Sequence, residues 1–491
     1  MSILNIHRGH RITSVVFDPP TALSKVLTDN GFTIAQPCGG RGSCGKCAVL
    51  LTGDTSVPNA AEVRCGARLA CQAILLGDAE VTLPDVLPMQ QIEGGRHANL
   101  SPAHPMGGQY GAAVDIGTTT IALQLYDLPT GALLGASSML NPQTSVAADV
   151  IGRIDASLHG RAEDLRIQVE SAIAALLATA CSHAGVPPMA VSSLVVTGNT
   201  TMLYLLTGRN PYTLSRAPFE ADCFFGKETN LLNRCVYLPD CLHAFVGADT
   251  TCALLASVMT EQNETSLLCD IGTNGEMALW HRGKLYIAST AAGPAFEGAG
   301  ISCGCASILG AIDKVDIVNG QLHCHTIGNH PAVGICGSGL LDAVAALLDT
   351  ETLDETGYLA DESIDLASGV TLTQADIRAV QLAKAATFAG IMSLLSAAGC
   401  TAEDVSTLYI AGGFGSHLNL RSAVRIGLIP ESLADRVQVI GNAALDGASM
   451  LLMDVTKQEK IASFREHTVH VRLDGNPHFA ECYVEAMLFE E

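Results

Sequence analysis

Four cysteines near the start of the chain have the spacing of ligands for an iron–sulfur cluster. Three of them, Cys38, Cys44 and Cys47, lie in the glycine-rich segment CGGRGSCGKC, and Cys71 follows farther along the chain. A [2Fe–2S] cluster is commonly held by four cysteine thiolates. The glycines allow such a loop to aim backbone N–H groups at the sulfurs. The pattern therefore predicts a [2Fe–2S] cluster and electron transfer.

Two alternatives concern the same cysteines. Cys44 and Cys47 also form half of a structural zinc site, but zinc requires a second close pair, and five residues separate Cys65 from Cys71. Cys65 competes with Cys71 as the fourth cluster ligand. We favour Cys71, because residues 68–72 are predicted to pass the loop in extended form, whereas Cys65 is predicted in a turn.

The spacing of the first two ligands indicates a particular kind of domain. Plant-type ferredoxins place four residues between these ligands, and this chain places five, which resembles adrenodoxin-like ferredoxins. Residues 1–87 are accordingly expected to form a small α+β, ferredoxin-like (β-grasp) domain.

A second motif occurs twice, and its residue types suit a nucleotide phosphate. Residues 112–127 and 267–280 each run from an apolar strand into Asp-Ile-Gly-Thr. Asp115 and Asp270 end these strands, where they can hold Mg²⁺, a cation that uses few carboxylates. The turns that follow offer a concave set of amides and hydroxyls for phosphate, from Gly117, Thr118, Thr119, Thr120, Gly272, Thr273 and Asn274. The duplication predicts two halves that clamp one ATP.

The other parts of such a clamp follow in order. Residues 195–202 form a strand that runs into a polar turn at Asn199, and the strand LYIAGGF ends in Gly412 and Gly413, which suit close approach by adenosine. A last turn and helix start near residue 441. In this order the region 109–491 resembles the acetate kinase–sugar kinase–Hsp70–actin (ASKHA) superfamily, which implies a duplicated α/β ATPase domain.

The whole set of motifs resembles the reductive activators of corrinoid-dependent methyltransferases. The segments that carry this resemblance are CGGRGSCGKC, DIGTTT, NPQ, GNTTM, DIGTNGE, AGPAFEGA, GICGSGLLD and AGGFG. It implies that the protein uses ATP to pass one electron from the cluster to a cob(II)alamin-type cofactor, which regenerates Co(I). The implied partners are a corrinoid methyltransferase subunit and an upstream low-potential electron donor. Larger members carry a further small domain after the ferredoxin, which this chain is expected to lack.

The resemblance also implies roles for individual residues. Cys38, Cys44, Cys47 and Cys71 would hold the cluster, Asp115 and Asp270 would bind Mg²⁺ or orient the attacking water, and the residues of the two turns would hold phosphates. Related kinases place a carboxylate at a helix start near the γ-phosphate, which makes Asp249 a candidate general base. An N-cap role is the structural alternative for Asp249.

Other functions compete with this interpretation. Activators of 2-hydroxyacyl-CoA dehydratases share the ATPase fold and hold a [4Fe–4S] cluster between two subunits, and Cys303, Cys305 and Cys336 could imitate its ligands. A small-molecule kinase with an accessory cluster would need an acceptor pocket, and an Hsp70-like protein would need a peptide-binding domain. Neither is evident in the sequence.

The elements that must position these residues divide the chain. We predict a ferredoxin domain at 1–87, a Pro- and Gly-rich linker at 88–108 and an ATPase domain at 109–491, with lobes at 109–265 and 266–491. Long helices are expected over residues 162–184 and 373–398, and strands that alternate with helices indicate a layered α/β domain.

Composition excludes several further classes. The net charge of −22 argues against nucleic-acid binding. No apolar run approaches the roughly 18 residues of a membrane span, and the N-terminus lacks a secretory signal pattern. Seventeen cysteines then indicate reduced thiols in a cytoplasmic protein. The corrinoid partner, the electron donor and the formation of a homodimer stay open.

Overall fold

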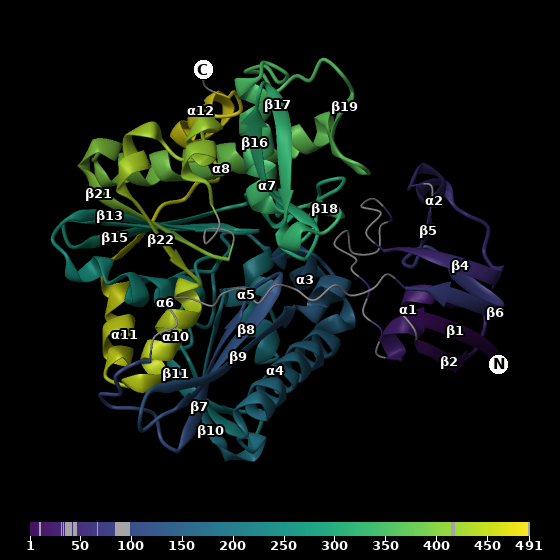
Figure 1. The fold of residues 1–491 in the computed structure, drawn as a ribbon. Helices are drawn as coiled ribbons and strands as arrows, with labels where there is room; N and C mark the ends of the chain where they lie inside the picture. The colour runs from purple at the N-terminus through teal and green to yellow at the C-terminus, as the bar shows by residue number, and fades with distance from the viewer. Residues whose placement is uncertain are drawn as a thin grey trace. The chain divides into compact units, whose positions relative to one another are not determined.

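The computed structural model describes residues 1–8, 11–30, 32, 34, 42, 47–65, 67–83, 99–413 and 418–489. Two compact units make up the chain. The first consists of Met1–Pro88 and Pro142–Arg161, and the second of Met89–Asn141 and Ala162–Glu491. Figure 1 shows the elements of both, coloured from purple at the N-terminus to yellow at the C-terminus.

The first unit contains a mixed β-sheet with the strand order β2-β1-β6-β4-β5. An antiparallel hairpin, β1 with β2, is extended by β6, which runs parallel to β1. Leu4 and Ile6 on β1, with Leu23 and Leu27 on the helix that crosses the sheet, are almost fully buried. This arrangement matches the predicted β-grasp domain. Its elements are β1 (Ser2–Arg8), β2 (Arg11–Phe17), β3 (Thr21–Ala22), α1 (Leu23–Asp29), β4 (Ala48–Thr55), α2 (Ala60–Cys65), β5 (Arg68–Leu69) and β6 (Ile74–Thr82). The helix α3 (Val150–Ala156), from the later segment Pro142–Arg161, also belongs to this unit.

Two local predictions in this unit are wrong. The segment before Cys71 is extended only over β5, and Cys71 itself lies in the turn that joins β5 to β6, where the N–H groups of Gln72 and Ala73 both donate to the Leu69 carbonyl. Cys65 is the last residue of the helix α2 and does not lie in a turn. The alternation of apolar residues could not show a strand of two residues, because a period needs more length than that.

The second unit contains two six-stranded sheets with matching topology. In the first, the antiparallel meander β7-β8-β9 is extended on the β7 side by β10, which runs parallel to β7. In the second, the meander β13-β14-β15 is extended by β21, which runs parallel to β13. The repeated Asp-Ile-Gly-Thr motif therefore marks a duplicated fold, as predicted. The strands are β7 (Tyr110–Ile116), β8 (Thr120–Asp127), β9 (Ala132–Leu140), β10 (Val191–Gly198), β11 (Lys227–Leu231), β12 (Arg234–Leu238), β13 (Thr265–Ile271), β14 (Gly275–His281), β15 (Lys284–Thr290), β21 (Val405–Ala411), β22 (Val437–Gly441) and β23 (Thr468–His470).

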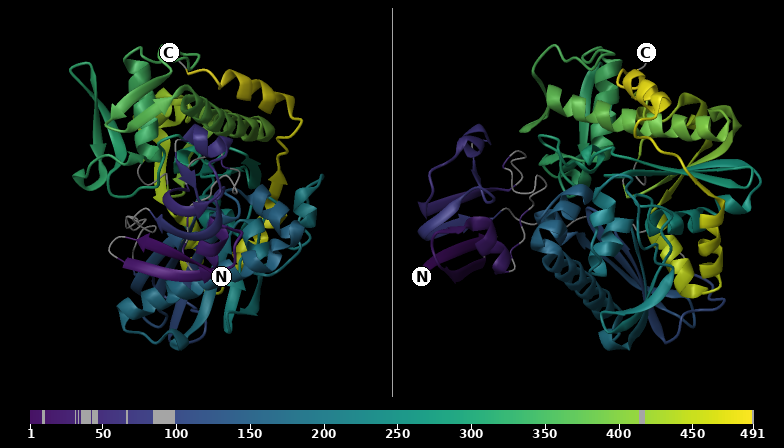
Figure 2. Two further views of the ribbon diagram at one scale, coloured as in Figure 1. Left: turned by 90° about the vertical axis from the view of Figure 1, so that its right-hand side faces the viewer. Right: turned by 180° about the vertical axis from the view of Figure 1, so that it is seen from behind.

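Helices cover these sheets and join them. The helix α4 packs on β8 and β9, α8 packs on β14 and β15, and α10 packs on β7 and β10 as well as on α6 (Figures 1 and 2). One apolar core contains residues of both sheets together with α6 and α10. The helices are α4 (Ala162–Ala184), α5 (Thr200–Leu206), α6 (Ala248–Ser257), α7 (Gly337–Asp349), α8 (Gln374–Ala398), α9 (Leu420–Arg425), α10 (Ala443–Met453), α11 (Lys457–His467) and α12 (Pro477–Glu485).

Two small sheets accompany the second half of this unit, and the longest helix ends as its sequence indicates. The small sheets consist of β16 (Ala311–Val318), β17 (Gln321–Thr326) and β18 (Gly334–Ile335), and of β19 (Ser363–Ala367) and β20 (Val370–Thr373). Thr373 and Asp376 form a capping box at the start of α8, and Gly399 ends it in the left-handed conformation with φ 68°. Both features agree with the prediction.

Part of the predicted linker is fixed to the second unit. The N–H groups of Ala103 and Met106 donate to carbonyls of Met453 and Leu452, and Leu100 donates to Gly131. Met106 is buried. Residues 99–108 are therefore not a flexible tether, and the remainder of the predicted linker lies outside the described residues.

Two helical stretches are long and apolar enough to cross a membrane by length and composition, Val150–Ala184 and Gln374–Ala398. The second packs on β14 and β15, and 72% of its most apolar window is buried. Core helices of this kind pass the same test, so length and hydropathy alone do not indicate a membrane span here.

Candidate functional site

A cavity of about 240 Å³ in the second unit is lined by the residues of both copies of the repeated motif. All of the residues predicted to bind nucleotide or to act on it line this one cavity: Asp115, Gly117, Thr118, Thr119, Thr120, Asn199, Asp249, Asp270, Gly272, Thr273, Asn274, Gly412 and Gly413. The structure thus brings together groups that are more than 290 residues apart in sequence.

Strand pairing explains why these residues meet. Asp115 near the end of β7 is the register partner of Thr197 on β10, and Asp270 near the end of β13 is the partner of Ala411 on β21. Parallel neighbours end at the same edge of a sheet, and ligands bind at such edges. The turn at Asn199 therefore lies beside the first motif, and Gly412 lies beside the second.

Gly412 is required by this close approach. Its φ of +93° is one that residues with side chains rarely adopt, and a Cβ placed on it would lie 2.5 Å from Oδ1 of Asp270. Any larger residue would collide with that carboxylate.

Burial raises the pKa of three aspartates in the cavity, and for two of them neighbouring carboxylates add to the shift. Burial, followed by the charge of Asp249, raises the pKa of Asp115 to about 7, although a hydrogen bond from Asn442 opposes the shift. Burial, followed by the charges of Asp249, Asp115 and Glu297, raises the pKa of Asp270 to about 8. Burial raises the pKa of Asp249 to about 6. Two of these carboxylates, those of Asp115 and Asp270, are the predicted ligands of Mg²⁺, a hard cation that binds oxygen, uses few carboxylates and keeps several waters.

Glu276 adds a fourth acidic group that the sequence reasoning did not assign. It is buried in the cavity wall, directly across the β13–β14 ladder from Asp270. Burial, followed by the charges of Asp249 and Asp270, raises its pKa well above the ordinary value. Burial and the neighbouring negative charges thus both favour the protonated form of Glu276.

Two asparagines at helix starts hold the first motif from both sides. Asn199 caps α5 by accepting from the Met202 N–H (3.0 Å), and its Nδ2 donates to Oγ1 of Thr118 (3.2 Å). Asn442 caps α10 by accepting from the Leu445 N–H (2.9 Å), and its Nδ2 donates to Oδ2 of Asp115 (3.1 Å). Each asparagine thus fixes a helix N-terminus and a site residue together.

Glu297 joins the two copies of the motif. Its Oε1 accepts from the backbone N–H of Thr273 (2.7 Å) and from Oγ1 of Thr273 (3.0 Å), and its Oε2 accepts from Oγ1 of Thr119. These are donors that were predicted to hold phosphate. Glu297 thus occupies these donors in this structure, and its carboxylate accepts the same kind of hydrogen bond that a phosphate oxygen would accept.

The alternatives for Asp249 and for the three later cysteines have structural answers. Gly247 is the N-cap of α6, so Asp249 is not the cap; it lies in the first turn and accepts from the Thr250 N–H (2.7 Å). Cys305 and Cys336 line the cavity. Cys336 is the N-cap residue of α7, and Cys303 lies near Thr371 instead, with its Sγ 3.5 Å from the Thr371 nitrogen.

The first unit brings two of the predicted cluster ligands together. The sulfurs of Cys47 and Cys71 are 3.2 Å apart, close enough to bind one iron or two adjacent ones. Cys38, Cys44 and the side chain of Cys65 lie outside the described residues, and no group of three or more acidic, histidine or cysteine side chains in the described ranges is arranged to hold a metal ion. The close thiol pair fits the soft sulfur donors that iron–sulfur clusters require.

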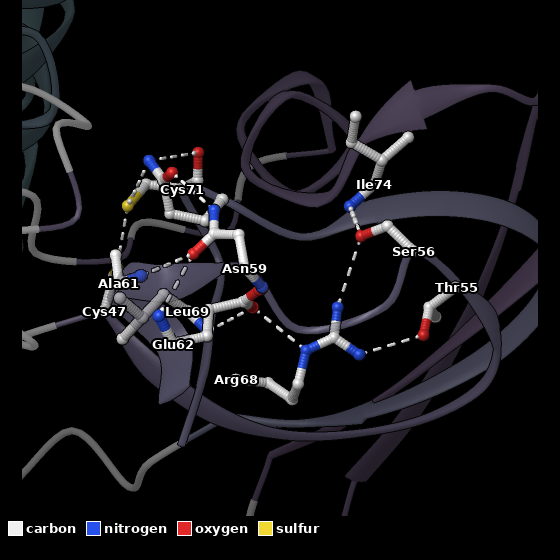
Figure 3. Close-up of polar contacts among 11 residues, drawn as sticks. Cys47, Thr55, Ser56, Asn59, Ala61, Glu62, Arg68, Leu69, Cys71 and Ile74 are labelled. Atoms are coloured by element: carbon white, nitrogen blue, oxygen red, sulfur yellow. Dashed lines mark hydrogen bonds and ion pairs between the residues drawn. The ribbon is translucent and has the colours of Figure 1, made fainter. Parts of the chain in front are cut away.

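A buried ion pair supports this cysteine pair (Figure 3). Glu62 on α2 accepts from Nε of Arg68 (2.9 Å) and from the Leu69 N–H (3.0 Å). Burial raises the pKa of Glu62, but the hydrogen bonds from Arg68, Asn59 and Leu69 together with the Arg68 charge lower it overall. Glu62 is therefore ionised and ties α2 to β5, three residues from Cys71.

Signals for the missed residues were present in the motifs. Glu276 ends DIGTNGE, Glu297 lies in AGPAFEGA, and Asn442 directly precedes α10. Each is a polar residue within or beside a motif that the sequence analysis singled out. Their partners come from other segments, so the strings alone could not assign a contact.

Three family descriptions match the chain. They are "2Fe-2S iron-sulfur cluster binding domain" over residues 7–76, "RACo middle region" over 110–262, and "C-terminal domain of RACo the ASKHA domain" over 264–491. The "Corrinoid activation enzyme RamQ" of Eubacterium limosum is 34% identical, over 77% of this chain and 70% of the relative. The chain belongs to the reductive activators of corrinoid proteins.

Two further similarities agree with this family. The "[Co(II) methylated amine-specific corrinoid protein] reductase" of Methanosarcina barkeri is 28% identical to the activator over 72% of this chain and 71% of the relative. The solved structure of a "Reductive activator for corrinoid,iron-sulfur protein" matches it with a TM-score of 0.72 and 26% identity, over 100% of this chain and 98% of the other. The predicted ferredoxin-like and ASKHA folds are confirmed, as are the [2Fe–2S] cluster and ATP as cofactors.

One prediction about the family is wrong. The activator was expected to lack a middle domain, but residues 110–262 match the middle region of the family. The sequence analysis assigned those residues to the first ATPase lobe, because they carry the first copy of the repeated Asp-Ile-Gly-Thr motif. The domain boundaries proposed from sequence stay predictions.

The raised pKa values predict how stability depends on pH. Asp270 ionises near its ordinary value of 3.8 in the unfolded chain but at about 8 in the folded activator. The folded state thus binds more protons between these values, so stability falls as pH rises through them, by up to about 1.4 kcal/mol per pH unit for one proton. Asp270→Asn does not titrate. In urea unfolding with a metal chelator, it should gain stability relative to the wild type from about pH 5.5 to about pH 8.5; a relative loss would contradict the assigned pKa.

Proposed function

We propose that this activator couples ATP hydrolysis at the cavity of the second unit to one-electron reduction of a corrinoid held by a methyltransferase subunit. The observation that carries the proposal is the cluster of Asp115, Asp249 and Asp270 in one cavity with the two phosphate turns. Its presence in one chain with the Cys47–Cys71 pair supports a nucleotide site and an electron-transfer site in the same protein.

ATP is needed because the electron moves uphill. The Co(II) form of a corrinoid accepts one electron to give Co(I), and the [2Fe–2S] cluster supplies one electron when bound. A gap of about 59 mV is tenfold in equilibrium constant for one electron, so an uphill gap of about 200 mV costs roughly 4 to 5 kcal/mol. We propose that the free energy of ATP hydrolysis offsets this cost of the uphill electron transfer.

The residues of the cavity would divide the work on ATP. Asp115 and Asp270 would hold Mg²⁺, which supplies charge neutralisation at the phosphates when bound. The turn of Thr118 and Thr119 and that of Thr273 and Asn274 would donate to phosphate oxygens. Asp249 would accept a proton from the attacking water; with a pKa raised to about 6 it is mostly ionised near neutral pH and more basic than an ordinary aspartate, which suits this role.

Partners and location follow from the same proposal. The name of the Methanosarcina barkeri relative says that it reduces a corrinoid protein specific for methylated amines. We propose that a corrinoid methyltransferase subunit of this general kind is the partner of this chain. An upstream low-potential donor must reduce the cluster. Seventeen cysteines in a chain that holds an iron–sulfur cluster favour reduced thiols and therefore support a reducing cytoplasm. We also propose that two copies of the activator form a homodimer.

A visible spectrum tests the reaction. A corrinoid methyltransferase subunit in the Co(II) form is mixed anaerobically with the activator, a chemical reductant and Mg·ATP. The Co(I) band should grow only when both ATP and the activator are present, because the reductant alone cannot cross the gap. Equal growth without ATP would contradict the coupling, and growth without the activator would contradict its role.

A further inference from the structure

A glutamine next to the cluster cysteines contacts the sulfur of one of them. The Nε2 group of Gln72 donates toward Sγ of Cys71 at 3.6 Å, and toward the Cys71 carbonyl oxygen at 3.4 Å. A thiolate that binds iron carries more negative charge than a thiol and is the better acceptor of the two.

Asn59 fixes which end of the Gln72 amide faces that sulfur. Its Nδ2 donates to Oε1 of Gln72 at 2.9 Å. Because the amide oxygen is used there, the N–H₂ end is left to point at Cys71. Hydrogen bonding of this kind is what assigns the orientation of an amide.

Asn59 is itself held in place. Its Oδ1 accepts from the N–H groups of Ala61 (2.9 Å) and Glu62 (3.1 Å), and its own N–H donates to Oε2 of Glu62 (2.9 Å). The ion pair of Glu62 with Arg68 anchors this turn (Figure 3). A continuous chain of hydrogen bonds thus leads from Arg68 through Glu62, Asn59 and Gln72 to Cys71.

One glycine of the glycine-rich loop that carries the cluster cysteines lies against the Gln72 side chain. Gly42 belongs to that loop and has φ +70°, and a Cβ on it would lie 3.0 Å from Cδ and Cγ of Gln72. The glutamine is therefore packed between a loop glycine and the Asn59 turn. Such second contacts to metal ligands tune the metal that the ligands hold.

We propose that Gln72 is a positioning residue of the cluster site, whose amide donates a hydrogen bond to the Cys71 sulfur and raises the reduction potential of the bound cluster. Reduction adds negative charge to the cluster and its sulfurs, and an N–H group directed at a sulfur stabilises the reduced form more than the oxidised form. Gln72 would thus make the cluster easier for the upstream donor to reduce.

A redox titration of the full-length, cluster-loaded protein tests this. Gln72→Leu keeps the volume of the side chain and removes the donor, and it should lower the midpoint potential by about tenfold in equilibrium constant, or about 59 mV. Asn59→Asp keeps the acceptor that caps α2 but offers no donor to Oε1, so the amide should turn its oxygen toward Cys71 and lower the potential in the same direction. An unaltered potential in Gln72→Leu would overturn the proposal.

Two further arms keep the test decisive. Asn5→Asp adds the same charge elsewhere in the domain, where Ser14 can still donate to it; an equal shift in Asn5→Asp and Asn59→Asp would overturn the role of the amide. Glutamine labelled at its side-chain nitrogen should give a hyperfine coupling to the reduced wild-type cluster that disappears in Asn59→Asp. A coupling that persists would count against the proposal even if Gln72→Leu held no cluster.

The inference rests on the proposed cluster site, and the two can fail separately. A wild-type protein that binds no [2Fe–2S] cluster would refute the site. A normal cluster with the same potential in all variants would refute only the role of Gln72.

Discussion

Asp115→Asn and Asp270→Asn should each reduce ATP turnover at least about a hundredfold, because loss of one preorganised electrostatic group from a transition-state site typically costs two to three orders of magnitude. Both substitutions should also stop corrinoid reduction. ATP hydrolysis is measured as the phosphate released into solution, and Co(I) formation is measured from the visible spectrum. These are among the largest effects that we expect from single changes in this protein.

In the structure, both substitutions can remove a charge while preserving the local hydrogen bonding and packing. An asparagine at 115 retains an oxygen that can accept the hydrogen bond from Nδ2 of Asn442, so α10 keeps its contact with the motif. An asparagine at 270 has the shape of the protonated aspartic acid that burial favours there, since the pKa of Asp270 is about 8. Neither change removes packing volume. What both remove is a negative charge that Mg²⁺ needs beside the phosphates.

Matched measurements separate this role from folding. Asp361→Asn makes the same chemical change at an exposed position of the same unit and should leave turnover unaltered. The [2Fe–2S] absorption of all three variants should equal that of the wild type, because the cluster cysteines belong to the other unit. Normal hydrolysis by both Asp115→Asn and Asp270→Asn would refute the assignment of the repeated motif to nucleotide binding.

The sequence predicted the parts of the activator that are encoded by local repetition. Two copies of Asp-Ile-Gly-Thr at the ends of apolar strands indicated a duplicated sheet, and the matching order of β7-β8-β9 and β13-β14-β15 confirms it. The capping box of Thr373 with Asp376 likewise located the start of α8. Such signals depend on neighbours in the chain, which one sequence displays directly.

What the sequence could not predict depends on contacts between distant segments. Glu297 connects Thr119 and Thr273 across 178 residues and 24 residues, and no spacing rule links them. The raised pKa of Glu276 results from burial and from charges on other elements. The middle region was not recognised for a related reason: residues 110–262 carry the first copy of the repeated motif, so the motifs alone did not mark them as a separate region.

The fourth cluster ligand is the assignment that a single substitution can decide most sharply. Cys71→Ser should lose the [2Fe–2S] cluster or distort it severely, because a serine oxygen replaces a soft thiolate at a position where two sulfurs lie 3.2 Å apart. Anaerobically purified wild type should contain two irons and two sulfides per chain, as this cluster type requires, and give a rhombic signal when reduced. In Cys71→Ser, iron content and this signal should fall together.

Cys65→Ser is the matched control, because Cys65 ends α2 only six positions earlier. It should retain iron, sulfide and the rhombic signal. Loss in Cys65→Ser with retention in Cys71→Ser would transfer the fourth ligand to Cys65. Cys303→Ser should also retain the cluster, since Cys303 belongs to the other unit and lies beside Thr371.

The same variants show whether ATP hydrolysis can proceed without the cluster, and whether cobalt reduction can proceed without ATP hydrolysis. Cys71→Ser leaves every residue of the nucleotide cavity in place, so ATP hydrolysis should persist while Co(I) formation stops. Asp270→Asn should instead keep an intact cluster but show neither ATP hydrolysis nor Co(I) formation. If Cys71→Ser still formed Co(I) at the wild-type rate with a chemical reductant and ATP, the Cys47–Cys71 cluster would not be the immediate electron donor to cobalt.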